Sequence, residues 1–163
     1  MTQEERLTRY DRMRYTKDSL ASTLVLLAIV LDALYFVSIY QSDIGSYYYN
    51  WAIGASIIYN LVFLLAAFLC SEGVKNRTRG YEIPLALIGV MQFVRIFWLP
   101  AKAYAATVVI SGEEIAVMKP GQYLYVVACL AVSGALCLAA AVLSGIHNAT
   151  LARYLRSMEN KTA

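Results

Sequence analysis

Residues 20–40 read LASTLVLLAIVLDALYFVSIY, an apolar run of membrane-spanning length that a single charge, Asp32, interrupts. An α-helix needs about 20 consecutive apolar residues to cross the ~30 Å hydrocarbon core of a bilayer. The run therefore predicts a transmembrane helix with a carboxylate inside it. A charge at this depth is costly, so Asp32 is expected to face a bundle interior, to pair with another charge or to mark a transport path.

Three further apolar runs complete the pattern, at residues 50–70, 83–102 and 122–146. The composition agrees with a membrane location, since 60% of the 163 residues are hydrophobic. A cleaved secretory signal is not expected, because about nineteen mostly polar residues precede the first run. We therefore expect an all-α integral membrane protein in which residues 20–146 form a four-transmembrane-helix bundle.

Basic residues indicate which ends of the helices face the cytoplasm. They gather in the N-terminal segment 1–19, the connection 71–82 and the C-terminal tail 147–163. The members of these groups are Arg6, Arg9, Arg12, Arg14, Lys17, Lys75, Arg77, Arg79, Arg153, Arg156 and Lys161. The positive-inside rule then places both termini on the cytoplasmic side of a plasma membrane, and the connections 41–49 and 103–121 outside.

The net charge of +3 does not indicate a nucleic-acid partner, because the topology explains the basic residues and acidic residues are interleaved with them. Contact with the lipid bilayer is the simpler interpretation. Residues 4–18 are expected to form a short interfacial helix, with Leu7 and Tyr10 at helical spacing and arginines that reach lipid phosphates.

Arg95 is the second charge in the interior of an apolar run, and it lies at the same depth as Asp32. Each comes twelve residues after the cytoplasmic start of its helix, which at a rise of ~1.5 Å per residue is about 18 Å into the membrane. The other two helices bring polar residues to the same level, and a glutamine lies one turn from Arg95. The predicted intramembrane polar layer consists of Asp32, Asn60, Gln92, Arg95 and Ser133.

Three interpretations of this layer are open. In the first, which we favour, Asp32 and Arg95 pair inside the bundle and neutral polar side chains complete their hydrogen bonds, because hydrocarbon offers no other partners. In the second, one or both charges face another subunit and specify assembly. In the third, the layer belongs to a transport path, although a relay needs a group that changes state and a tightly paired Asp32 would stay ionised.

The fourth apolar run is rich in small residues at four-residue spacing, which lets helix backbones approach closely in a membrane. The predicted helix–helix interface consists of the row Ala131, Ala135 and Ala139 and the adjacent row Ser133, Cys137, Ala141 and Gly145. Packing within the chain and contact with another chain are both consistent with this spacing.

A contact surface is predicted at the outer ends of the helices. Its members are Tyr47, Tyr48, Tyr49, Trp51, Glu113 and Glu114. An aromatic belt at the headgroup boundary is the ordinary role of such aromatic residues, and packing on a partner or on a ligand is the alternative. Residues 107–118 read as two β-prone runs around a turn, so a short β-hairpin or an interfacial segment is expected in the second outer connection.

No catalytic, metal or cofactor site is expected. The sequence contains no P-loop, G-x-S-x-G, H-E-x-x-H or C-x-x-C motif, and Asp32 has no second intramembrane aspartate to share a proton with. Cys129 and Cys137 are eight residues apart on one helix, which is too far for a disulfide. The only histidine, His147, has no cysteine or acidic residue at ligand spacing, so packing or helix termination explains it better than a zinc site.

The remaining choice lies between two kinds of membrane protein. Four helices enclose little volume, so a transporter of this size would have to self-assemble or borrow helices from another chain. We therefore expect a non-catalytic small polytopic subunit that packs against a larger membrane assembly, such as a transporter, and stabilises or regulates it. The alternative is a small transporter or channel that works as a homo-oligomer and uses the polar layer around Asp32 and Arg95.

Overall fold

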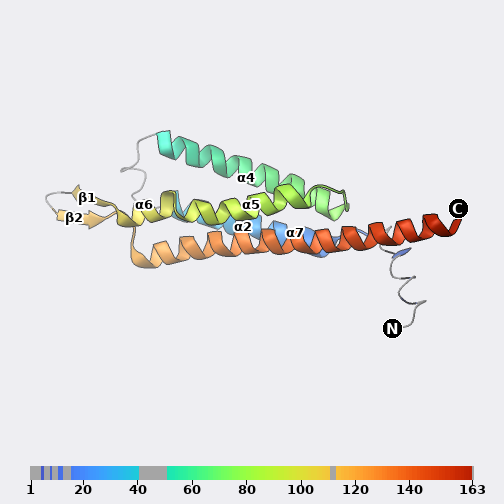
Figure 1. The fold of residues 1–163 in the computed structure, drawn as a ribbon. Helices are drawn as coiled ribbons and strands as arrows, with labels where there is room; N and C mark the ends of the chain where they lie inside the picture. Colours follow the sequence, from blue (N-terminus) through green and yellow to red (C-terminus); the bar gives the residue numbers. More distant parts are fainter. Residues whose placement is uncertain are drawn as a thin grey trace.

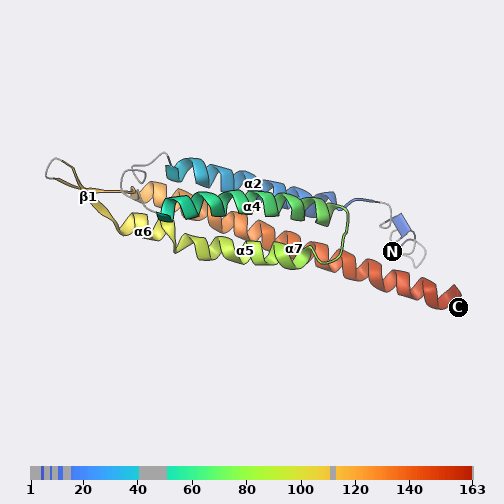
Figure 2. The same cartoon turned by 90° about the horizontal axis from the view of Figure 1, so that it is seen from above.

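The computed structural model describes residues 16–40, 51–110 and 113–162, together with residues 5, 8, 11 and 12. Within them, four helical segments are long and apolar enough to cross a membrane. They are α2 (Ser19–Tyr40), α4 (Trp51–Lys75), α5 (Glu82–Ile96) continued by α6 (Leu99–Ala105), and α7 (Pro120–Thr162). The segments run along one another (Figure 1; Figure 2). The predicted all-α class and the four apolar helices are confirmed.

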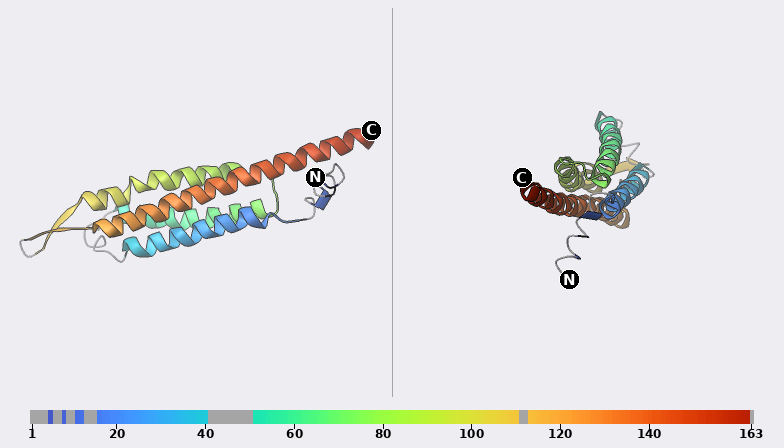
Figure 3. Two further views of the ribbon diagram at one scale, coloured as in Figure 1. Left: turned by 90° about the horizontal axis from the view of Figure 1, so that it is seen from below. Right: turned by 90° about the vertical axis from the view of Figure 1, so that its right-hand side faces the viewer.

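The helices form a bundle in which α2 and α5 each pack against both α4 and α7. Seen end-on, α4 and α7 lie on opposite sides (Figure 3). We call the end at which α2 and α5 begin and α4 ends the basic end, because Lys75, Arg77 and Arg79 lie there. The other end, which carries the strands β1 (Thr107–Ile110) and β2 (Glu113–Ala116), is the strand end.

Two apolar clusters fill the interior, one toward each end. The cluster at the basic end includes Val25, Ala28, Phe63, Leu85 and Cys137. The cluster at the strand end includes Tyr35, Ile39, Leu99, Val126 and Leu130. Along α2 and α7 the polar residues Asp32 and Ser133 fall between the two clusters, and both side chains are fully buried. The apolar core is therefore divided by a polar layer.

The outer face of α2 is as apolar as its inner face. Leu27, Val30, Leu34 and Val37 are each between 45% and 54% exposed, while the residues on the opposite face are buried. A helix that is hydrophobic all round is surrounded by protein or by lipid rather than by water. Because only one face of α2 touches protein, the surface of this bundle is suited to hydrocarbon.

Pro100 divides the third apolar run, predicted as one helix over 83–102, into two. The helix α5 ends at Ile96, and α6 restarts at Leu99 with the proline in its first turn. Proline has no N–H to donate to the carbonyl four residues earlier, and its ring collides with that carbonyl. A proline is nevertheless well tolerated in a first turn, so the chain breaks and begins a new helix.

The fourth helix is much longer than the apolar run that predicts it. Instead of ending at Ile146 with a separate tail over 147–163, α7 continues to Thr162 as one helix of 43 residues. Hydropathy marks where the chain leaves the hydrocarbon, whereas a helix ends only where the backbone is interrupted, and 147–162 contains neither glycine nor proline. At ~1.5 Å per residue these residues extend α7 by about 24 Å beyond the apolar run. His147 is therefore not a helix terminus.

Other connections also differ in detail from the sequence pattern. The second helix continues past residue 70 to Lys75, so the predicted connection 71–82 is reduced to 76–81. In the predicted interfacial helix 4–18, residues 5, 8, 11 and 12 are helical and 16–18 are not, and the rest lies outside the described residues.

The strands β1 and β2 pair antiparallel, with Thr107 opposite Ala116 and Ile110 opposite Glu113. They extend past the ends of the helices (Figure 1). The turn residues 111–112 lie outside the described part of the chain. Val117 donates its N–H to the carbonyl of Ala106 at 3.1 Å, which continues the pairing of the two chain segments by one residue beyond the strands.

Candidate functional site

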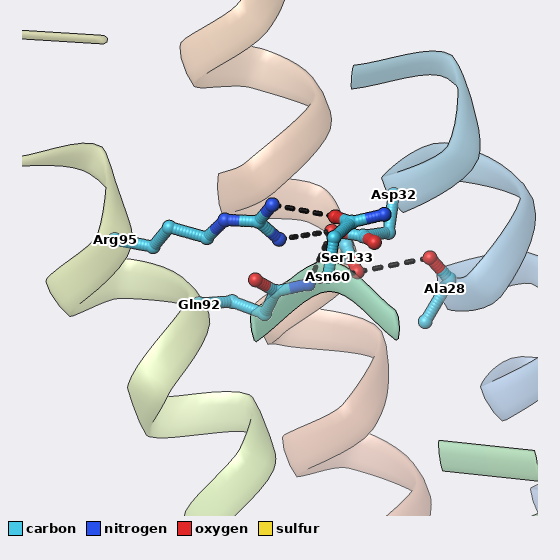
Figure 4. Close-up of polar contacts among 6 residues, drawn as sticks. All are labelled: Ala28, Asp32, Asn60, Gln92, Arg95 and Ser133. Carbon is cyan, nitrogen blue, oxygen red and sulfur yellow. Dashed lines mark hydrogen bonds and ion pairs between the residues drawn. The ribbon is translucent and has the colours of Figure 1, made fainter. Parts of the chain in front are cut away.

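The structure brings the five residues of the predicted polar layer together in the middle of the bundle (Figure 4). They come from all four helices: Asp32 from α2, Asn60 from α4, Gln92 and Arg95 from α5, and Ser133 from α7. All five side chains are buried, and Arg95, at 6% exposure, is the most accessible. Each of the four helices therefore contributes at least one buried polar side chain to the layer.

Arg95 is the hub of this layer. Its Nη1 donates to Asp32 Oδ1 at 2.7 Å, and its Nη2 donates to Asn60 Oδ1 at 2.5 Å. One guanidinium therefore joins α5 to α2 and to α4. Charge-assisted hydrogen bonds of this kind are roughly twice as strong as neutral ones. Both side chains are buried, so each charge has few alternative partners besides the residues of the layer.

Gln92 and Ser133 extend the network to α7. The amide of Gln92 donates to Asp32 Oδ1 at 2.9 Å and lies 3.4 Å from Ser133 Oγ. The hydroxyl of Ser133 in turn donates to the backbone carbonyl of Ala28 at 3.0 Å. Gln92 and Arg95 are three residues apart on one face of α5, and so both reach the same carboxylate. The layer fixes the register of the four helices relative to one another.

Two tyrosines that the sequence pattern did not assign to the layer complete the surroundings of Arg95. The Cζ atom of the guanidinium lies 4.4 Å from the ring centroid of Tyr35 and 4.9 Å from that of Tyr59. A cation within ~6 Å of an aromatic centroid is attracted by the negative face of the ring. Tyr35 lies one helical turn after Asp32 and Tyr59 directly precedes Asn60, but these positions alone do not show that the rings face Arg95.

Some polar atoms of this region have no partner. Asp32 Oδ2, Gln92 Oε1 and the Tyr35 hydroxyl are buried without a hydrogen bond to any described residue. An unsatisfied buried acceptor or donor is destabilising by about 1–3 kcal/mol. The layer therefore has unused acceptor capacity on the oxygen of Asp32 that does not bind Arg95.

A cleft of about 160 Å³ opens beside Arg95, between α4 and α5. Its lining residues are Ala55, Ser56 and Tyr59 on α4, Met91, Val94 and Arg95 on α5, and Trp98 and Leu99 at the start of α6. Val94 and Trp98 are each 49% exposed, so the cleft communicates with the outer surface. In Figure 1, α4 lies close to α5 near the basic end and diverges from it toward the strand end. The cleft is a recess in an otherwise apolar surface.

The two small-residue rows predicted on the fourth helix separate in the structure. Ser133, Cys137 and Ala141 are buried within the chain, whereas Ala135 and Ala139 are exposed on α7. The row of Ser133, Cys137 and Ala141 thus packs inside the bundle. Of the remaining members, Ala131 and Gly145 are half-buried.

A close contact between α5 and α7 involves a pair of glycines that the sequence pattern did not single out. A Cβ atom on Gly134 would lie 2.9 Å from the carbonyl oxygen of Gly89 and 2.8 Å from the ring of Phe93. A Cβ atom on Gly89 would lie 3.1 Å from the carbonyl oxygen of Gly134. Glycines in mid-helix allow such an approach of two backbones. They bring α5 and α7 close enough for Gln92 to meet Ser133.

A second polar cluster lies at the basic end. Asp18 caps α2 by accepting from the N–H of Ala21 at 3.3 Å, and its other oxygen lies 2.5 Å from Nδ1 of His147. Glu82 accepts from the side chain of Asn148 and, at 2.8 Å, from the N–H of Gly80. The sequence interpretation of His147 overlooked this contact, because its acidic partner is 129 residues away along the chain.

The predicted outer contact surface is only partly described. Residues 41–50, which include Tyr47, Tyr48 and Tyr49, lie outside the described part of the chain. Trp51 is the first residue of α4, and Glu113 and Glu114 begin β2. The side chain of Glu114 is exposed. The role of this surface stays a prediction.

The fold and the site together define the class of this protein: a four-helix bundle of membrane-spanning type with a buried ion pair at its centre. Comparisons of the chain with models of known protein families, with curated proteins and with solved structures find no match. The function is therefore argued from the site alone.

Proposed function

We propose that this chain is a non-catalytic integral membrane subunit that packs against a larger membrane assembly, such as a transporter, and stabilises or regulates it. It would lie in the plasma membrane with both termini in the cytoplasm, as the distribution of lysine and arginine favours. The cleft between α4 and α5 is the observation that carries the proposal. This cleft is the place where we expect a transmembrane helix of the partner to dock.

The pairing inside the polar layer supports a structural role for the charges. Arg95 is bound by a carboxylate and an amide of its own chain and lies against two aromatic rings. A group held in this way has no free charge to offer a permeating ion, and its proton is not available for relay. The layer accordingly favours a rigid bundle whose function lies on its outer surface.

The shape of the cleft supports a helix as its occupant. Burying an apolar side chain from lipid gains little, so membrane helices associate where close packing is achieved. Ala55 and Ser56 are small residues on the α4 side of the cleft, and the half-exposed Val94 of α5 and Trp98 at the start of α6 line its other side. A ridge of side chains on another helix would fill this recess better than lipid tails do.

Filling the cleft is expected to weaken association with the partner. We predict that Val94→Phe, which places a larger side chain in the cleft, lowers recovery of the partner at least about tenfold, a loss of roughly 1.4 kcal/mol. The measurement is affinity purification of the tagged chain from native membranes in mild detergent, with quantitative mass spectrometry of the co-purified proteins.

Val90→Phe is the matched control for this test. Val90 lies one turn from Val94 on α5, has the same 49% exposure and does not line the cleft. Recovery of the same partner with Val90→Phe, and its loss with Val94→Phe, would support the proposal. Equal recovery with the two variants, or purification of a pure homo-oligomer, would argue against it.

The second candidate function is a small self-assembling transporter or channel. The specific observation in its favour is the unpartnered Oδ2 of Asp32, which retains capacity to accept a proton or to contact an ion. This candidate predicts that Asp32→Asn folds normally and loses a flux through reconstituted vesicles. Loss of folding in the same variant favours the subunit.

A further inference from the structure

At the basic end, an open surface cavity of about 380 Å³ lies between the start of α5 and the extended part of α7. Three arginines line it: Arg79 before α5, and Arg153 and Arg156 on α7. Its floor is formed by small residues, Gly145, Ala149 and Ala152, which share one face of α7. The cavity is distinct from the cleft beside Arg95.

The charge balance of this cavity is positive. The one acidic residue that lines it is Glu82, and both of its carboxylate oxygens already accept hydrogen bonds, from Asn148 and from the N–H of Gly80. Within the described residues, none of the three arginines forms an ion pair or a side-chain hydrogen bond. All three are exposed. Three exposed guanidiniums therefore line one cavity, and among the described residues Arg79 has Glu82 as a charged neighbour while no ion pair within 4.0 Å uses any of the three.

The surface next to the cavity is apolar. At the start of α5, Ile83 is 77% exposed and Leu87 63%, and on α7 Val142 is 61% and Ile146 56% exposed. These residues belong to helices long and apolar enough to span a membrane, and the cavity lies where their apolar surface ends. A ligand held here would meet guanidiniums at one end and hydrocarbon at the other.

We propose that this cavity binds the phosphate of an anionic phospholipid, with the acyl chains lying along the exposed apolar surface of α5 and α7. Planar guanidiniums bind phosphate oxygens with paired, charge-assisted hydrogen bonds. Basic pockets between membrane helices are suited to lipid headgroups that carry net negative charge. The unbroken helix beyond Ile146 has a role here, because it brings Arg153 and Arg156 to the same cavity as Arg79.

Native mass spectrometry of the delipidated full-length protein tests the proposal. The probes are phosphatidylglycerol, phosphatidylcholine as the zwitterionic comparison, and inorganic phosphate at matched ionic strength. We expect phosphatidylglycerol to bind more tightly than phosphatidylcholine. The double variant R153Q/R156Q should lose at least about tenfold in affinity for phosphatidylglycerol, since each basic residue contributes roughly 1 kcal/mol of attraction to an anionic headgroup.

Two further variants distinguish binding of the lipid in the cavity from non-specific electrostatic attraction of the lipid to the protein surface. K102Q/K119Q removes two exposed positive charges outside the cavity, at the strand end, and it should retain affinity. Ala149→Phe fills the cavity without a change of charge, and it should lose affinity even if the arginine variant folds poorly. Equal losses in R153Q/R156Q and K102Q/K119Q, full binding by Ala149→Phe, or complete displacement of the lipid by inorganic phosphate would overturn the proposal.

Discussion

Asp32→Asn and Arg95→Gln are each expected to lower the free energy of unfolding by about 3–5 kcal/mol, because each leaves a buried charge without its partner. The pair is joined at 2.7 Å, and both side chains are buried in the polar layer. The double variant replaces both charges by neutral groups that still form hydrogen bonds. The double variant should therefore lose less free energy of unfolding than the two single variants lose together. The measurement is reversible unfolding in mixed detergent micelles.

Lys102→Gln serves as the control for this double-mutant cycle. Lys102 is an exposed cation on α6 that lies outside the layer, so its substitution should change stability by no more than about 0.5 kcal/mol. Additive losses for Asp32→Asn and Arg95→Gln would mean that the two side chains do not interact in the folded protein. Two fully stable single variants would contradict the internal ion pair.

Gly134→Ala is expected to destabilise the bundle by about 1–3 kcal/mol, because the added methyl group overfills the contact between α5 and α7. It would lie 2.9 Å from the carbonyl oxygen of Gly89, and a backbone atom cannot rotate away as a side chain can. The helices must move apart, which lengthens the 3.4 Å contact between Gln92 and Ser133. Thermal unfolding of the purified protein in detergent measures the effect.

Gly54→Ala gives the opposite expectation. Among the described residues, no atom outside the local helix backbone lies within 4 Å of a Cβ placed on Gly54 in α4, so the substitution is expected to remove the helix penalty of glycine, about 0.5–1 kcal/mol. If Gly54→Ala is stabilised and Gly134→Ala is destabilised, the close contact between α5 and α7 at Gly134 is the cause of the destabilisation. Equal effects of the two substitutions would show that α5 and α7 do not meet at this glycine pair.

The sequence predicted the central layer well because depth in a membrane can be counted. Asp32 and Arg95 come the same number of residues after the start of their helices, and helices that span one bilayer share its boundaries. Counting does not reveal which neighbour a side chain faces. The aromatic rings of Tyr35 and Tyr59 on Arg95, and the Gly89–Gly134 contact, depend on helix rotation and were therefore missed.

The basic end was predicted less well, because its contacts join residues that are far apart in the sequence. His147 meets Asp18 of another helix, and Asn148 meets Glu82. Hydropathy also gave no sign that the polar residues after Ile146 continue α7. The helix propensity of residues 147–162, and the absence of glycine and proline among them, are the features that indicate a continued helix. The cavity of the three arginines exists only because this extension is helical.

The most direct test of the proposed subunit role is site-specific photo-crosslinking in native membranes. A photoreactive phenylalanine analogue at Val94 lies in the cleft between α4 and α5, and the same analogue at the exposed Val142 lies on α7, across the bundle from α4. The proposed subunit role predicts an adduct with one larger membrane protein from position 94, and no adduct with that protein from position 142. Adducts with lipid alone, or with a second copy of this chain alone, would contradict it.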